Sequence, residues 1–101
     1  MDNYAVKLTD RAMRDLDSIY AYIANSLIEP ETADRLVGAI ENGILSLEQM
    51  PYRCPERTVG VYANQGYRQL LIRNYTVIYR VVESEKTVIV VTVCYSRREV
   101  I

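Results

Sequence analysis

The chain has 101 residues, of which half are hydrophobic and a quarter are charged, and its formal net charge is −1. These totals describe one globular domain over residues 1–101 and exclude both a disordered chain and a second hydrophobic core. The start lacks the basic and apolar stretches of a signal peptide, and no apolar run approaches the roughly 18–20 residues that span a bilayer. We therefore expect a cytoplasmic protein whose two cysteines, Cys54 and Cys94, are reduced thiols.

The charge is divided unevenly along the chain. Residues 1–50 hold four basic and nine acidic residues, while residues 51–101 hold eight basic and four acidic ones. Seven of the eight later cations are arginines, whose planar guanidinium suits recognition of carboxylate or phosphate. The later half therefore carries either a partner-binding surface or a solvated sheet edge and loops.

The first half of the sequence predicts a strand followed by two helices. Alternating apolar residues over 4–8 indicate a short strand. Thr9 is placed to cap a helix over about 9–26, and Pro30 is placed to start a second helix that ends at Pro51. Both helices carry an apolar stripe at three- and four-residue spacing, so we expect an antiparallel hairpin with a shared core.

The second half predicts a sheet. The segment after the second helix keeps no period, apart from a candidate short strand at 58–62. Strands over 67–73 and Tyr75–Val82 flank Asn74, which tolerates positive φ and favours a tight hairpin. Thr87–Tyr95 is apolar on both faces, which is typical of a central strand. We therefore predict an α+β fold: an N-terminal strand, an antiparallel helical hairpin, then three antiparallel strands, with the helices packed on one face of the sheet.

The alternation of side chains predicts which residues share a face of the sheet. One face of the middle strand carries Tyr75, Val77, Tyr79 and Val81. On the last strand, the residues expected to face the helices are Ile89, Val91, Val93 and Tyr95. The residues expected on the opposite face are Val88, Val90, Thr92 and Cys94. This second apolar strip needs a cover, from a loop or from a partner protein; with a partner, Val90→Asp should weaken the complex more than it destabilises the free chain.

The residue types present restrict the possible chemistry. There is no histidine, which excludes a Ser-His-Asp or Cys-His arrangement and makes a zinc site with two lone cysteines untenable. Most of the nine tyrosines fall on core-directed positions; the exceptions are Tyr52, Tyr62 and Tyr95. What remains is a set of arginines at positions 53, 57, 68, 73, 80, 97 and 98. Arginine binds phosphate but is a poor general base, so the set favours a binding protein or an RNase that works by positioning and electrostatics.

Several short segments, in a fixed order, carry a family resemblance. They are Lys7-Leu8-Thr9, Asp15-Leu16, Tyr22-Ile23, Leu36, Ile40, Gly66-Tyr67-Arg68-Gln69-Leu70, the strand from Tyr75 to Val81, and Tyr95-Ser96-Arg97-Arg98. In this order, over nearly the whole chain, they resemble the RelE/ParE superfamily of bacterial toxins from type II toxin–antitoxin pairs.

The resemblance implies a growth-inhibiting toxin of the kind associated with plasmid stabilisation, neutralised by a cognate antitoxin. One branch of the superfamily cleaves mRNA in the ribosomal A site, and the ParE-like branch inhibits DNA gyrase. Of the basic residues of the interferase pattern, Arg68 is matched, whereas Leu70 and Thr76 stand at two further basic positions. The helical hairpin and the strand Tyr75–Val82 look more like ParE, although the histidine that often precedes the paired arginines is absent.

We therefore predict a ParE-like toxin that acts by binding DNA gyrase and not by bond cleavage. The residues predicted to bind the target are Arg97 and Arg98. The residues predicted to bind the antitoxin are Val88, Val90, Thr92, Cys94 and Arg80. One alternative is a ribosome-dependent mRNA interferase with candidate catalytic residues Arg68, Arg73, Tyr95, Arg97 and Arg98; another is a non-toxic interaction module of the same fold. No metal, cofactor, membrane or sequence-specific DNA binding is expected of the toxin alone.

Overall fold

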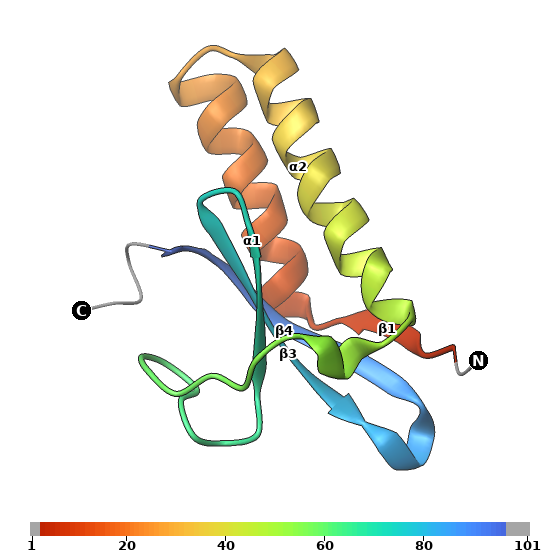
Figure 1. The fold of residues 1–101 in the computed structure, drawn as a ribbon. Helices are drawn as coiled ribbons and strands as arrows, with labels where there is room; N and C mark the ends of the chain where they lie inside the picture. The colour runs from red at the N-terminus through yellow and green to blue at the C-terminus, as the bar shows by residue number, and fades with distance from the viewer. Residues whose placement is uncertain (1–2, 97–101) are drawn as a thin grey trace.

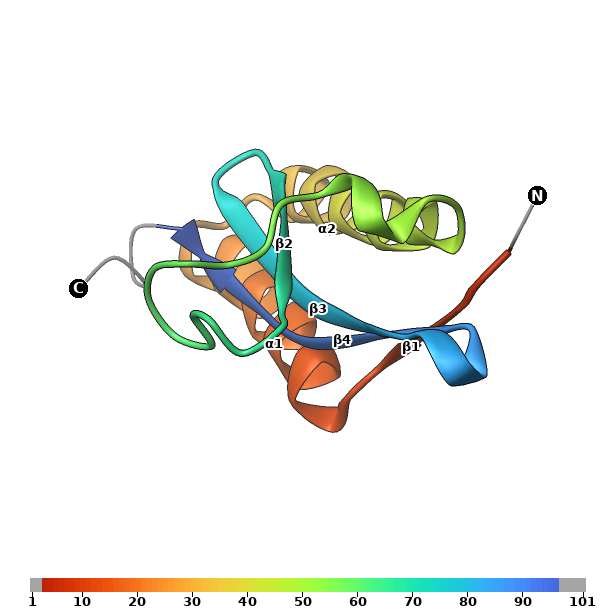
Figure 2. The same ribbon diagram turned by 60° about the horizontal axis from the view of Figure 1, so that its bottom comes forward.

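The computed structural model describes residues 3–96 and places a helical hairpin on one face of a four-stranded sheet (Figures 1 and 2). The elements follow in the order β1 (Ala5–Leu8), α1 (Asp10–Ala21), α2 (Pro30–Leu45), β2 (Arg68–Ile72), β3 (Tyr75–Val82) and β4 (Thr87–Tyr95). The strand order across the sheet is β1-β4-β3-β2, with β1 parallel to β4 and the other pairs antiparallel. The predicted α+β fold is confirmed, and β4 is a central strand.

The starts of both helices coincide with the residues predicted from the sequence. The Thr9 hydroxyl accepts the Ala12 N–H at 3.1 Å, which satisfies one of the free donors at the start of α1. α1 continues as a π-helical turn, Tyr22–Ser26, so the predicted helix over 9–26 is present with a wider last turn. Pro30 occupies the first turn of α2, and a 3-10 turn, Ser46–Glu48, leads toward Pro51.

The core lies between the hairpin and the sheet. Its buried residues include Leu16 from α1, Ile40 and Ile44 from α2, and Val77 and Tyr79 from β3. The predicted face of β3 is confirmed, because its tyrosines and valines pack in or against this core. Cys54 and Cys94 are both free thiols. Within residues 3–96, no helix has the length and apolarity that would let it cross a membrane.

The predicted faces of β4 are wrong in its first half. Val88 and Val90 are fully buried in the core shared with the helices, although we expected both on the opposite face. The cause is a β-bulge: Ile78 pairs with Thr92 and Tyr79 pairs with Val90, which leaves Val91 as an extra residue. One extra residue moves every earlier side chain to the other face of the strand. After the bulge the prediction holds, since Val93 is part of the core.

Two predictions about turns also need correction. The left-handed residue of the β2–β3 hairpin is Arg73, with φ 55°, and not Asn74. No strand forms at 58–62; the segment between the 3-10 turn Pro51–Arg53 and β2 is a loop, touching the sheet through a bridge between Glu56 and Arg68. In Figure 1 this loop lies at the side of the sheet away from the tip of the helical hairpin.

The face of the sheet opposite the helices is covered by the chain itself. Thr76 and Ile78 project from this face and are buried. Gln69, the cross-strand partner of Ile78, accepts a hydrogen bond from Arg57, which places the loop beside this face. The apolar strip predicted to need a partner therefore needs none at these positions.

Candidate functional site

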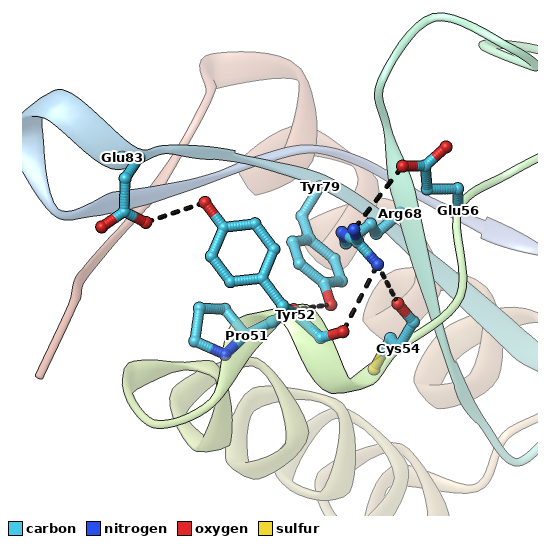
Figure 3. Close-up of polar contacts among 7 residues, drawn as sticks. All are labelled: Pro51, Tyr52, Cys54, Glu56, Arg68, Tyr79 and Glu83. Carbon is cyan, nitrogen blue, oxygen red and sulfur yellow. Dashed lines mark hydrogen bonds and ion pairs between the residues drawn. The ribbon is translucent and has the colours of Figure 1, made fainter. Parts of the chain in front are cut away.

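Arg68 is the centre of a polar cluster at the start of β2 (Figure 3). Its Nη1 donates to the Cys54 carbonyl oxygen at 2.6 Å, and its Nη2 lies 3.6 Å from Glu56 Oε1. Its guanidinium carbon also lies 5.1 Å from the centre of the Tyr52 ring, within cation–π range. Arg68 thus fastens the segment 52–56 to the sheet, and a phosphate would have to compete with these contacts.

Tyr52 is held from its other end by Glu83. The Tyr52 and Tyr4 hydroxyls each donate to Glu83 Oε1 at 2.8 Å, and Lys86 bonds the second carboxylate oxygen. The hydrogen bonds from Lys86, Tyr52 and Tyr4 lower the pKa of Glu83 to about 2, so this carboxyl is ionised near neutral pH. The carboxylate links Tyr4, just before β1, with the 3-10 turn before the loop and the β3–β4 turn, which is a structural role.

Tyr79, on β3, is the buried member of the cluster. Its side chain is fully buried, and its hydroxyl donates to the Pro51 carbonyl oxygen at 2.6 Å. Burial, followed by contact with Cys54, raises the pKa of Tyr79 far above its ordinary value. The phenol therefore stays neutral at physiological pH and is a fixed hydrogen-bond donor, unsuited to proton transfer.

A groove of about 810 Å³ separates α1 from the second half of β4. β1 pairs with β4 only as far as Val90, so within residues 3–96 no strand pairs with β4 on that side after this residue. The Asp15 carboxylate on α1 accepts the Val93 N–H at 3.0 Å and the Thr92 hydroxyl, which satisfies part of this edge. The groove is lined by the tyrosines 22, 75 and 95, with Arg11, Ser18 and Cys94.

The structure separates the residues of the predicted catalytic set. Arg68 pairs with Tyr79 and Tyr95 pairs with Tyr75, so the two rows are four residue steps apart along β3, which is about 13 Å. Arg73 lies in the turn at the Tyr95 end of the sheet. Arg97 and Arg98 lie outside the described residues. Arg68 therefore does not share one site with Tyr95.

The residues predicted to bind the antitoxin differ in accessibility. Val88 and Val90 are fully buried, and Thr92 is buried with its hydroxyl on Asp15. Arg80 is exposed on the face opposite the helices, and Cys94 is half-buried beside the groove. Sequence reasoning missed Glu83, and it named Arg57 only as one of seven arginines, because nothing in their neighbourhood marks a contact across 31 or 12 residues. Tyr52 had a signal, a tyrosine outside any predicted apolar stripe.

A helical hairpin on one face of this mixed sheet is the architecture of RelE/ParE superfamily toxins. The chain matches the family of the ParE toxin of the parDE type II toxin–antitoxin system over residues 6–100, and it belongs to that family. No curated protein sequence matches the chain.

Solved toxin structures share the fold. The chromosomal ParDE system of P. aeruginosa is 26% identical, covers 94% of this chain and 98% of that chain, and has a TM-score of 0.77. The RelBE2 complex of Mycobacterium tuberculosis is 23% identical, with 94% and 93% coverage and a TM-score of 0.69. A mutant of the E. coli toxin RelE is 12% identical, with 97% and 94% coverage and a TM-score of 0.61. The last two show a common fold only.

Proposed function

We propose that this toxin stops growth in the cytoplasm by binding DNA gyrase, and that it cuts no covalent bond. The observation that carries the binding mode is the engagement of Arg68, whose guanidinium bonds the Cys54 carbonyl and pairs with Glu56. Positions 70 and 76, basic in the interferase pattern, are leucine and threonine, and the chain has no histidine. The choice of gyrase rests on membership of the ParE family.

The test is a pair of assays on the purified toxin. We expect it to inhibit DNA supercoiling by gyrase and to leave ribosome-bound mRNA intact. In cells, expression without antitoxin should slow growth and induce the DNA-damage response. Cleavage of mRNA within ribosomes, with gyrase unaffected and DNA undamaged, would contradict the proposal and favour an interferase. Unchanged growth would favour a non-toxic interaction module.

The predicted target-binding residues, Arg97 and Arg98, extend this proposal. Arginine is common among the residues that dominate protein interfaces, where one truncation often costs about 2 kcal/mol or more. Replacing both with alanine should abolish growth inhibition while the melting temperature and antitoxin binding stay near those of the wild type. Full toxicity of the double variant, measured by growth at matched expression, would exclude these two residues as anchors.

The cognate antitoxin is the second partner of the toxin. Of the residues predicted to contact it, Arg80 and Cys94 have accessible surface, whereas Val88 and Val90 have none. We propose that acidic antitoxin side chains pair with Arg80, since charge complementarity speeds association and fixes register. Arg80→Glu should slow antitoxin association, measured by surface plasmon resonance, more than it speeds dissociation.

A further inference from the structure

The loop between the 3-10 turn and β2 contains a stretch without charge. Residues 58–66 read Thr-Val-Gly-Val-Tyr-Ala-Asn-Gln-Gly, in a chain of which a quarter is charged. Val59 is 69% exposed and Val61 is 60% exposed, so neither valine contributes its side chain to the core. The stretch therefore presents two apolar side chains to water on a segment that has no electrostatic role.

A buried arginine holds this loop. Arg57 is 2% exposed; its Nε donates to the Val61 carbonyl oxygen and its Nη1 donates to Gln69 Oε1 on β2 at 2.8 Å. Its backbone N–H donates to the Tyr67 carbonyl, and its own carbonyl accepts the Asn64 N–H, both at 2.8 Å. A buried charge is tolerated only when its hydrogen bonds are satisfied, and here the loop backbone helps to satisfy them.

The backbone of the loop is held in an uncommon conformation. Gly60, Tyr62, Asn64 and Gly66 all have φ between 58° and 86°, in the left-handed region. A tyrosine is rarely found there and persists only where its surroundings fix the conformation. Tyr62 is fixed by its ring, whose centre lies 4.8 Å from that of Tyr67. Arg57 and this ring pair together hold the loop in one shape.

We propose that residues 58–66 form a preorganised recognition loop, whose Val59 and Val61 enter an apolar pocket on the protein target of the toxin. The proposal rests on the proposed function, in that the toxin acts by binding a protein. A loop that is rigid before binding loses little conformational entropy on association, so its contacts contribute fully to affinity. Arg57 is a positioning residue, because it acts through the loop and has almost no surface of its own.

The chemistry of the loop decides between possible partners. Nucleic acid is disfavoured because binding to its backbone depends on cations, and residues 58–66 contain none. An acidic antitoxin segment would find no opposite charge here, in contrast to Arg80. An apolar pocket on a target protein fits these properties best.

The central test is the double variant Val59→Ser with Val61→Ser. Burying one valine contributes about a tenfold gain in affinity or more, so we expect target binding to weaken at least about tenfold. Growth inhibition should then require correspondingly higher expression, while thermal melting and antitoxin binding stay unchanged. The matched control is Leu71→Ser, because Leu71 is 62% exposed on the neighbouring strand β2 but lies outside the loop. This control should inhibit growth as strongly as the wild type.

The positioning role of Arg57 has its own readout. Arg57→Met should speed amide exchange across 58–66 and lower toxicity, and Arg57→Lys should recover part of both. An Ile44→Val variant, which loses stability in the core without touching the loop, should keep its toxicity at a comparable melting temperature. Equal toxicity loss in the Ile44 and Arg57 variants would reduce Arg57 to a stabilising residue and overturn its positioning role.

The other outcomes are distinct. A double valine variant that inhibits growth like the wild type overturns the loop proposal alone. Loss of antitoxin binding in that variant, or a changed oligomeric state, overturns it in favour of those partners. A wild-type chain without any effect on growth overturns the proposed function together with the loop. Purified gyrase then tests the target: weaker gyrase inhibition by the variant supports both proposals.

Discussion

Two valine-rich regions of this toxin behave in opposite ways. β4 holds Val88 and Val90 in the core, whereas the loop over 58–66 exposes Val59 and Val61 to solvent. The difference lies in how each backbone is satisfied. β4 bonds to β1 and β3 on its two sides, so its side chains pack between layers, while the loop backbone is tied to a buried arginine and faces outward. Apolar residues on a central strand thus stabilise the fold, and apolar residues on a separately held loop are available to a partner.

The largest effect is expected from a pair of substitutions that place a charge in each region. Val90→Asp should unfold the free toxin, because a carboxylate without a partner in a closed core costs more than about 4 kcal/mol. Val59→Asp should leave the free energy of unfolding within about 0.5 kcal/mol of the wild type, since the side chain already faces water. Urea denaturation of both variants checks the contrast. A folded Val90→Asp protein with normal stability would remove the distinction between the two regions.

A smaller effect is expected from removing single hydroxyl groups, one buried and one exposed. Tyr79→Phe leaves the buried Pro51 carbonyl without its donor and should cost about 1–3 kcal/mol. For a domain of this size, each kcal/mol lowers the melting temperature by about 4–8 °C. Tyr52→Phe removes an exposed hydroxyl and should shift the melting temperature much less. Equal shifts by calorimetry would mean that the Pro51 carbonyl finds another partner.

The smallest expected effect depends on pH. The folded-state pKa of Glu83, about 2, is below its ordinary value of 4.5, so its ionised form stabilises the fold above pH 4.5. That contribution is lost as pH falls toward 2. The melting temperature of Glu83→Gln should therefore lie below that of the wild type at neutral pH, and the gap should close between pH 4.5 and 2. Apolar core side chains have no ionisable group. The difference in melting temperature between the wild type and a conservative core variant such as Ile44→Val should therefore stay constant between pH 4.5 and 2.

The helices and the face of β3 followed from sequence because their signals are local. Thr9 and Pro30 mark helix starts by their own chemistry, and the alternation along Tyr75–Val82 is unbroken. The bulge at Val91 could not be recognised in the sequence, because an extra valine in a valine-rich run does not change the hydrophobic pattern. The candidate short strand at 58–62 does not form, because residues 60 and 62 are left-handed and break the extended chain.

The site was less predictable than the fold because its contacts are remote in sequence. Arg68 was recognised as the match to a basic position of the interferase pattern. The pattern could not show that its guanidinium donates a hydrogen bond to the Cys54 carbonyl oxygen. Arg57 was one arginine among seven, and its burial depends on Gln69 and on the fold of the loop. Composition did contain the loop's signal: nine uncharged residues with two valines, directly after Arg57.

The parallel pairing of β1 with β4 has a consequence for the order of synthesis. Ala5 aligns with Thr87 and Leu8 with Val90, so the first and the last strand of the fold lie side by side, with β1 at the edge of the sheet. Contacts this distant in sequence form late, because a long loop must close first. A nascent chain that stops before β4 leaves β1 without a neighbour and the core without Val88, Val90 and Val93. Prematurely terminated translation products of this toxin should therefore be harmless to the cell that makes them.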